Sequence, residues 1–151
     1  MPKPFTLLLR VRYAECDYQG VVFNSRYVDM ADVAATEFFR VLFGDYQNIL
    51  DQGLDSQVVK LSTEWQASAK FDDVLALEVN TARVGNSSYQ LDVDYINHQS
   101  GQVIARTEIT YVMVDSKDYR PTAVPDAIRE SLTAGADGII IDQTGTHSKR
   151  D

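Results

Sequence analysis

The spacing of apolar residues changes along this 151-residue chain, and the order of those changes restricts its fold more than any other feature. Apolar residues first alternate with polar ones, which predicts a half-buried β-strand carrying Leu7, Leu9, Val11 and Tyr13 on one side. Over residues 25–43 they recur at steps of three and four, as along one face of a helix: Tyr27, Met30, Ala31, Ala34, Phe38, Val41 and Leu42. The chain therefore begins with a strand and then a long helix, which Gly44 ends.

Alternation returns four times after this helix. The runs are residues 59–69, 75–81, 89–95 and 103–113, and turn residues lie in each break between them. The breaks are too short for the crossover that parallel neighbours need, so the strands should pair in antiparallel order. The first run should place one set of side chains on a single face: Val59, Leu61, Thr63, Trp65, Ala67 and Ala69.

These elements predict an α+β fold, with an antiparallel sheet of about five strands packed on one long helix. The small side chains of Ala31, Ala34 and Ala35 let that helix approach the sheet closely. A further helix is predicted over residues 125–133. We assign residues 1–134 to a single domain and residues 135–151 to a C-terminal extension, with a short β-like run and disorder beyond about Asp142.

Composition excludes several classes of function. The formal charge is −8 and no basic stripe is interleaved with aromatic residues, so a nucleic-acid partner is not expected. No apolar run approaches the roughly 20 residues of a membrane span, and the start resembles no secretory signal, which predicts a cytoplasmic protein without a membrane partner. The single cysteine, Cys16, leaves no disulfide framework and too few thiols for a cysteine-based metal site, so no metal is expected.

Residues 13–27, "YAECDYQGVVFNSRY", place two carboxylates shortly before the expected helix start, which Asn24 or Ser25 can cap. A helix N-terminus has unpaired N–H groups and partial positive charge, so it can polarise a carbonyl and stabilise an oxyanion. If Asp17 reaches that carbonyl, it can act as a nucleophile or as a general base for water. The combination suggests acyl hydrolysis, whereas the simpler interpretation of Asp17 is an Asx turn before Gly20.

Three stretches carry a recognisable family pattern. In "VRYAECDYQGVVFNSRYVDMADVAATEFFR" an aspartate precedes Gly-Val-Val, an aromatic residue and a tyrosine three residues after the helix-start residue. "EWQASAKFDDVLALEV" has an Ala-basic-aromatic-Asp-Asp turn between two strands, and "TEITYVMVDSKDYRP" a last strand and its turn. Together they resemble the 4-hydroxybenzoyl-CoA thioesterase-like family over roughly residues 6–125. The resemblance implies the hotdog fold, in which a sheet wraps a long central helix.

The same resemblance implies an acyl-CoA thioesterase and assigns its residues. Asp17 matches the family's catalytic aspartate, Gly20 the glycine of the loop, and Asn24 the helix-start residue whose backbone N–H binds the thioester oxygen. Tyr27 matches the aromatic residue one turn into the helix, and Lys70 matches the basic residue of the turn. A homodimer or homotetramer with its active site between subunits is also implied. No cofactor is expected, because coenzyme A is part of the substrate.

Several candidate residues have a simpler interpretation beside the functional one. Lys70 and Arg83 can bind the phosphates of coenzyme A, or they can be ordinary solvated side chains. Phe23 and Tyr27 can line an acyl pocket, although such residues more often belong to the core. The cysteine needs a nearby histidine to act as a nucleophile; His98 and His147 are the candidates, and neither is well placed, so an inert thiol is expected.

Two other functions remain open at this point. One is a non-catalytic protein that holds an acyl group or a small hydrophobic molecule in the same groove; its affinity would survive Asp17→Asn. The other is a thioesterase that acts on acyl carrier protein, which the acidic charge of this chain disfavours because carrier proteins are themselves acidic. The sequence does not choose among short, long and aromatic acyl groups.

Overall fold

The computed structural model describes residues 3–145. In chain order, the elements are β1 (Phe5–Arg10), the 3-10 helix η1 (Tyr13–Glu15), α1 (Arg26–Phe43), α2 (Gln47–Leu50), β2 (Leu54–Trp65), β3 (Val74–Val84), β4 (Ser88–Asn97), β5 (Val103–Asp115), α3 (Asp126–Ala134) and β6 (Ile140–Asp142). The α+β class is therefore confirmed. The helices predicted over residues 25–43 and 125–133 correspond to α1 and α3.

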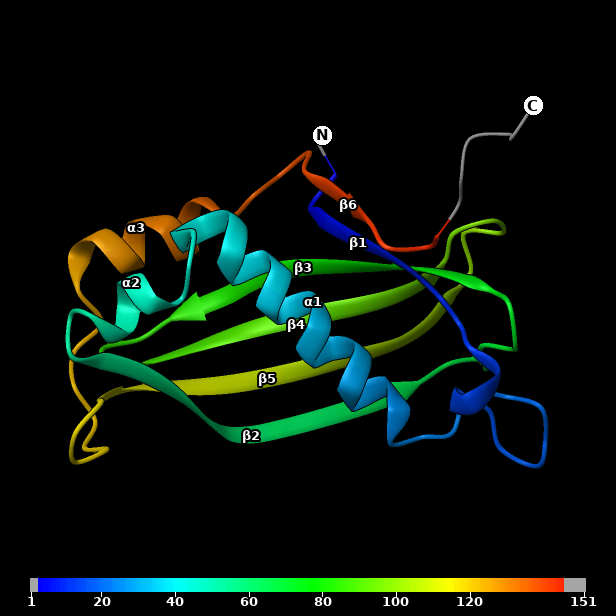
Figure 1. The fold of residues 1–151 in the computed structure, drawn as a ribbon, viewed down its shortest axis with the longest axis horizontal. Coiled ribbons are helices and arrows are strands. Elements are labelled where there is room, and N and C mark those ends of the chain that lie inside the picture. The colour runs from blue at the N-terminus through cyan, green and yellow to red at the C-terminus, as the bar shows by residue number, and fades with distance from the viewer. Residues whose placement is uncertain (1–2, 146–151) are drawn as a thin grey trace.

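The strands form one sheet in the order β2-β5-β4-β3-β1-β6 (Figure 1). Neighbouring strands are antiparallel, as predicted, except that β6 runs parallel to β1. The register aligns Leu7, Leu77, Tyr95 and Ala105 in one row across four strands, and all four residues are fully buried. That row lies on the inner face of the sheet, so the alternation in the sequence sets which face is buried.

Helix α1 packs across the inner face and contacts β1, β3 and β4 (Figure 1). Ala31, Ala34 and Phe38 are 0% exposed on its sheet side. The small alanine side chains let the helix axis come close to the sheet, and the Phe38 ring packs against Phe5 of β1 with ring centroids 5.6 Å apart. The core therefore lies between α1 and the middle strands.

The sheet has six strands rather than the predicted five. Strand β6 has only three residues, too few for alternation to identify it, and its pairing with β1 joins segments that are far apart in the sequence. Beyond it, the Gln143 N–H donates to the Leu8 carbonyl oxygen (2.9 Å), and the Arg10 side chain donates to the Thr144 carbonyl oxygen (3.2 Å). The rest of the segment predicted to be disordered, residues 146–151, lies outside the described residues.

The predicted face of the first strand is wrong at Tyr13. This side chain is 79% exposed, because the chain leaves β1 after Arg10 and turns in η1 instead of continuing as a strand. Because the strand ends before Tyr13, its side chain faces solvent and not the side that alternation predicts.

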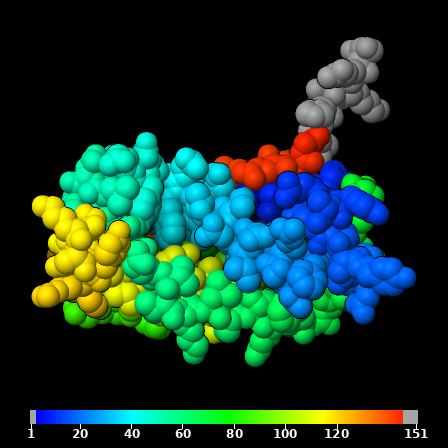
Figure 2. Space-filling view, turned by 60° about the horizontal axis from the view of Figure 1, so that its bottom comes forward, coloured from blue at the N-terminus to red at the C-terminus, as the bar shows by residue number. Residues whose placement is uncertain are grey.

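Edge strand β2 keeps its inner face partly open, because α1 does not cover it. Leu61 and Trp65 share that face, as predicted, yet they are 37% and 47% exposed. Val58 is 53% exposed, and Val59 falls in a β-bulge that interrupts the predicted alternation. Figure 2 shows the surface hollowed between α1 and β2, where part of β5 remains visible.

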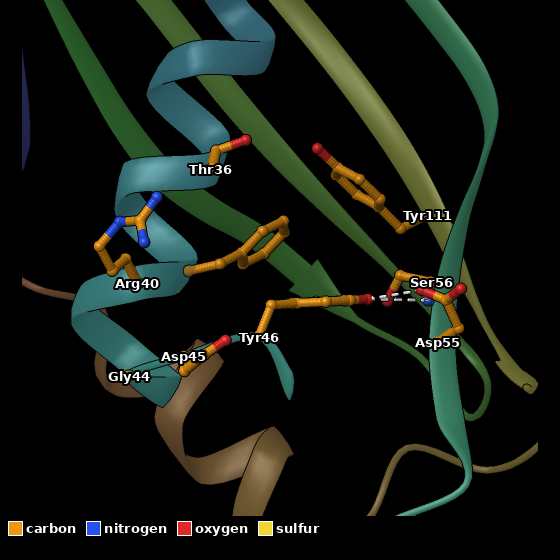
Figure 3. A pocket seen from close by; sticks show the side chains of 9 residues that line it. Thr36, Arg40, Gly44, Asp45, Tyr46, Asp55, Ser56 and Tyr111 are labelled. Carbon is orange, nitrogen blue, oxygen red and sulfur yellow. Dashed lines mark hydrogen bonds between the residues drawn. The ribbon is translucent and has the colours of Figure 1, made fainter. Parts of the chain in front are cut away.

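One end of this hollow deepens into a pocket of about 370 Å³, which we call the α1–β2 pocket. It lies beside the C-terminal half of α1 (Figure 3). Its walls include Thr36 and Phe39 of α1, Tyr46 at the start of α2, Asp55 and Ser56 of β2, and Tyr111 of β5.

Candidate active site

Asp17 lies at the base of a tight loop that joins η1 to α1. Cys16 and Val22 form a bridge across the loop, and the Asp17 N–H donates to the Val21 carbonyl oxygen (2.9 Å). The Gly20 N–H closes the turn on the Asp17 carbonyl oxygen (2.9 Å), with φ of +79° at Gly20, a conformation that favours glycine. The loop is thus a miniature hairpin that fixes the direction of the Asp17 side chain.

The Asp17 carboxylate is half-buried and partly engaged by its own turn. Its Oδ1 accepts a hydrogen bond from the Gln19 N–H (2.8 Å), which is the Asx turn of the simpler interpretation. Within residues 3–145, Oδ2 makes no hydrogen bond and Asp17 forms no ion pair. One carboxylate oxygen therefore holds the turn while the other remains available.

The start of α1 offers free backbone donors a few residues later. Ser25 is the N-cap residue, but its side chain makes no capping hydrogen bond. The N–H groups of Asn24 and Ser25 have no acceptor among the described residues, and both residues are exposed. Asn24 and Ser25 thus supply the combination of free N–H groups and helix dipole that the sequence predicted for an oxyanion site.

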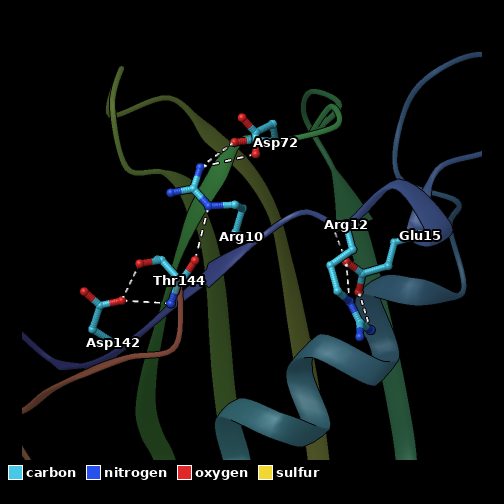
Figure 4. A network of polar contacts seen from close by, with 6 residues as sticks. All are labelled: Arg10, Arg12, Glu15, Asp72, Asp142 and Thr144. Atoms are coloured by element: carbon cyan, nitrogen blue, oxygen red, sulfur yellow. Dashed lines mark hydrogen bonds and ion pairs between the residues drawn. The ribbon is translucent and has the colours of Figure 1, made fainter. Parts of the chain in front are cut away.

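A buried carboxylate, Glu15, connects this loop to the helix start (Figure 4). It is 8% exposed, its Oε1 accepts the Arg12 backbone N–H (2.7 Å), and the Arg12 guanidinium lies 3.4 Å from the same oxygen. Its carbonyl oxygen accepts the Phe23 N–H (2.9 Å). Glu15 is therefore ion-paired with Arg12, and its carbonyl group holds Phe23, the residue that precedes Asn24.

The segment after β2 completes the surroundings of the loop. Val21 bridges to Lys70, and the Val22 N–H donates to the Ala69 carbonyl oxygen (2.9 Å). The Ala69 N–H in turn donates to the Tyr27 hydroxyl (3.2 Å). The structure thus brings together Asp17, Gly20, Phe23, Asn24, Tyr27 and Lys70. Phe23 and Lys70 are exposed, whereas Tyr27 is 2% exposed and its ring lies in the core.

Arg83 lies apart from this group. It is near the end of β3, where its guanidinium donates to the Ser88 hydroxyl (3.2 Å) at the β3–β4 turn. Lys70 lies before the opposite end of the same 11-residue strand, which spans about 35 Å.

A pocket of about 320 Å³ opens beside Asp17. Aromatic side chains of Tyr13, Tyr18 and Phe71 line it, and the Tyr13 and Phe71 rings meet edge to face with centroids 5.8 Å apart. None of these three residues was predicted from the sequence to belong to the site. The sequence indicates two of them only by position, because Tyr18 directly follows Asp17 and Phe71 directly follows Lys70.

The arrangement does not favour cysteine chemistry. Partial burial, reinforced by the carboxylates of Glu15 and Asp17, raises the pKa of the Cys16 thiol, which disfavours the thiolate. His98 lies in the turn after β4, and His147 lies outside the described residues. Within residues 3–145 no group of three His, Cys, Asp or Glu side chains is placed to hold a metal ion, and no helix is long and apolar enough to cross a membrane.

Known proteins match most of this architecture. The family model described as the Thioesterase-like superfamily matches residues 11–132. The acyl-CoA thioesterase YbgC of Haemophilus influenzae is 26% identical over 129 residues, covering 85% of this chain and 93% of that protein. The acyl-CoA thioester hydrolase YbgC of Escherichia coli O157:H7 is 27% identical over 120 residues, covering 80% and 89%. The matched range contains the Asp17 loop and α1, whereas β6 follows it.

Solved structures share most of this fold. A probable thioesterase, YbaW from Escherichia coli, aligns with a TM-score of 0.76 at 23% identity, covering 85% of this chain and 96% of that chain. A 1,4-dihydroxy-2-naphthoyl-CoA thioesterase from Synechocystis aligns with a TM-score of 0.76 at 21% identity, covering 85% and 94%. At these identities the likeness establishes a shared fold.

Proposed function

This chain belongs to the Thioesterase-like superfamily, as the resemblance in its sequence predicted, and from that membership we propose that it hydrolyses the thioester bond of an acyl-CoA. We assign it the hotdog arrangement, with the sheet curved about α1. The observation that carries the proposal is local. One short loop presents a half-buried carboxylate and, seven residues later, two N–H groups at a helix start; among residues 3–145, one carboxylate oxygen and both N–H groups have no hydrogen-bond partner.

In the proposed reaction, the thioester carbonyl oxygen accepts a hydrogen bond from the Asn24 N–H. Negative charge that develops on this oxygen is then stabilised by the N–H group and by the α1 dipole. Asp17 either attacks the carbonyl carbon, forming an anhydride that water hydrolyses, or removes a proton from the attacking water. In both routes the C–S bond breaks and the coenzyme A thiolate leaves.

We assign substrate contacts to the remaining residues around the loop. Phe23 flanks the helix start, and Gly20 lets the backbone turn close to the substrate. The buried ring of Tyr27 supports the first turn of α1 from the core side. Lys70 is the basic side chain proposed for the coenzyme A phosphates, and Arg83 would reach that site only from another subunit. Coenzyme A is part of the substrate, and no separate cofactor or metal is assigned.

A second copy of the chain is the proposed partner. Strand β2 has one edge without a strand neighbour within the described sheet, and the exposed apolar residues Val58, Val59 and Leu61 lie on it. Pairing two β2 edges would satisfy the open backbone groups and bury these side chains. We therefore propose a homodimer formed through β2, and a homotetramer as the assembly of two such dimers. A cytoplasmic location is a separate part of the proposal.

Thiol release from short, medium, long and aromatic acyl-CoAs tests the function, with wild type and Asp17→Asn measured together. The variant should lose at least about 100-fold in kcat, or about 2.7 kcal/mol of transition-state stabilisation. Asp137→Asn, an exposed aspartate after α3, is the matched control and should retain full activity. Circular dichroism reports whether each variant folds.

The outcomes separate the alternatives. A wild type that binds acyl-CoA without releasing thiol would contradict the enzyme and favour the non-catalytic binder. Hydrolysis of acyl carrier protein thioesters alone would favour the carrier-protein enzyme. Single turnover in oxygen-labelled water distinguishes the two routes, because only the anhydride route places label in Asp17.

A further inference from the structure

We propose that Arg10 is a positioning residue for coenzyme A binding: the end of β6 holds Arg10, and Arg10 holds the turn that carries Lys70 and Phe71 beside the Asp17 loop. This inference rests on the proposed function. It gives a role to two parts of the chain, the end of β1 and the segment after α3, that do not take part in the proposed reaction.

The turn of residues 69–73, which we call the Phe71 turn, forms one wall of the pocket beside Asp17. Phe71 lines that pocket, and its ring meets the Tyr13 ring edge to face. Both residues are more than half exposed, so core packing does not fix where the two rings lie. Lys70, the basic side chain proposed for the coenzyme A phosphates, is in the same turn and is also exposed. The backbone of the Phe71 turn therefore determines where these contacts are presented.

Backbone hydrogen bonds hold the base of the Phe71 turn, and a side chain holds its tip. The Val11 N–H donates to the Asp73 carbonyl oxygen (2.8 Å), and the Asp72 N–H donates to the Val11 carbonyl oxygen (3.1 Å). Asp72 has φ of +69°, a left-handed conformation that is uncommon for a residue other than glycine and persists where its surroundings hold it. Arg10 Nη1 donates to the Asp72 carbonyl oxygen and to Asp72 Oδ1, both at 3.3 Å. Arg10 therefore stabilises the strained residue next to Phe71.

Residues at the end of β6 hold Arg10 in place for this contact (Figure 4). Arg10 is the last residue of β1, and its Nε donates to the Thr144 carbonyl oxygen (3.2 Å). Thr144 is 8% exposed, and its N–H and hydroxyl both donate to Asp142 Oδ1 (2.8 and 2.6 Å). An exposed ion pair alone adds little stability, because ordering the two side chains offsets their attraction. Thr144 orders the guanidinium beforehand, so Arg10 can hold Asp72 at a smaller entropic cost.

Both ends of this connection lie outside the range that the family model matches, residues 11–132. Arg10 precedes the range and β6 follows it, whereas the Phe71 turn and the Asp17 loop lie inside. Strand β6 pairs with β1 as far as Leu8, which brings Thr144 level with Arg10. The connection is therefore made by the flanking residues of this chain, and the family match by itself does not supply it.

The Phe71 turn bears on binding rather than on the chemical step. Asp17 and Asn24 are the groups proposed to act at the thioester, whereas the Phe71 turn contributes an aromatic ring and a cation that contact coenzyme A. A displaced turn should therefore weaken the binding of coenzyme A, in the substrate and in the product alike. Loss of such uniform binding raises KM and leaves kcat unchanged.

Replacing Arg10 tests the connection. Arg10→Met should raise KM about 10-fold for the acyl-CoA that wild type hydrolyses best, or about 1.4 kcal/mol, and keep kcat within about twofold. The Kd of free coenzyme A, measured by calorimetry, should rise by the same factor. Arg120→Met removes another ion-paired arginine, at a turn beyond β5, and should match wild type. A fall in kcat at unchanged KM, or no change in either, would overturn the inference.

A lysine at the same position separates positioning from charge. Arg10→Lys keeps the positive charge, but one ammonium group replaces the two nitrogens, Nε and Nη1, that reach Thr144 and Asp72. This variant should raise KM nearly as much as Arg10→Met. A KM equal to that of wild type would mean that the charge of Arg10 acts on coenzyme A directly, which would contradict a positioning role.

Asp142→Ala tests the part played by β6, because this exposed residue reaches the Phe71 turn only through Thr144 and Arg10. It should raise KM about threefold with kcat unchanged. Asp118→Ala is the matched control: this aspartate also accepts a backbone N–H in an exposed turn, that of Arg120 (3.0 Å), and its loss should leave KM unchanged. If Asp142→Ala and Asp118→Ala behave alike, the end of β6 does not hold Arg10.

A double-mutant cycle tests whether Arg10 acts through Phe71. Phe71→Ala should raise KM, and Arg10→Met should add little to it, since residues that act as a unit have non-additive effects. Fully additive effects would contradict the connection. Circular dichroism reports whether each variant folds.

The outcomes also distinguish this inference from the proposed function. A wild type that binds coenzyme A without hydrolysing any acyl-CoA would refute the proposed function, and the Kd of Arg10→Met would still test the inference. A wild type that does neither would refute both. An active wild type whose KM and Kd do not respond to Arg10→Met refutes this inference alone.

Discussion

Asp17 combines a structural and a chemical role in one side chain. Oδ1 accepts the Gln19 N–H and fixes the turn, and among the described residues Oδ2 has no hydrogen-bond partner. The Asx turn and the catalytic interpretation are therefore compatible, because a carboxylate has two oxygens with several acceptor positions. A turn of this kind orients the side chain before substrate arrives, which reduces the ordering needed for reaction.

Tyr27 gives a stability prediction at this scale. Tyr27→Phe should lower the free energy of unfolding by about 1–2 kcal/mol, because the Ala69 N–H, in a residue that is 0% exposed, loses its acceptor. Urea denaturation measures the change. Tyr119→Phe, at a residue 59% exposed, is the control and should be neutral. Equal stability of the two variants would mean that the Tyr27 hydroxyl is dispensable.

The sequence predicted the residues of the loop but not all of their neighbours. Asp17, Gly20 and Asn24 lie close together in the chain, so a local pattern and a family resemblance were enough to select them. Tyr13 and Phe71 are brought to the same pocket by η1 and by the turn after β2. Their contact depends on chain reversals that periodicity does not encode.

At the scale of elements, length decided which predictions held. The 18-residue α1 and the strands of 10 or more residues repeat their pattern often enough to be recognised. The three residues of β6 do not. The open inner face of β2 was also missed, because alternation indicates that a face is apolar but not which helix covers it.

One arginine of α3 is hydrogen-bonded to the sheet, in addition to the buried side chains of Ile128 and Leu132, which makes its contribution testable. The Arg129 guanidinium donates to the carbonyl oxygens of Gly85 (2.8 Å) and Val84 (3.3 Å) at the β3–β4 turn. Arg129→Met should lower the free energy of unfolding by about 1–3 kcal/mol, because charge-assisted hydrogen bonds are lost. Glu130→Met, on the exposed side of α3, should have little effect in the same urea titration. If the two variants unfold alike, the hydrogen bonds do not hold α3.

For the whole molecule, buried tyrosines predict how stability depends on pH. Burial raises the pKa of Tyr46 to about 12 and also raises those of Tyr89, Tyr95 and Tyr111. The unfolded chain releases these protons from about pH 10 upward, while the folded chain retains them. Tyrosine titration thus leaves stability unchanged below pH 10 and lowers it above, by about 1 kcal/mol per pH unit for each proton.

Urea denaturation at pH 8, 9, 10 and 11 measures this dependence. The free energy of unfolding should fall steeply only in the last interval, and Tyr46→Phe should make that fall shallower. A stability that stays level through pH 11 would show that these tyrosines titrate alike in the folded and unfolded chains.

The short strand β6 limits how far the sheet can grow. It occupies the side of β1 that would otherwise accept another strand, so β2 offers the only long edge among the described strands. When two copies join at β2, the shared sheet ends on both sides in a three-residue strand, which is a poor template for pairing with a strand of another chain. Assembly by strand addition then terminates itself at a closed pair, because no long edge remains from which a fibre can grow.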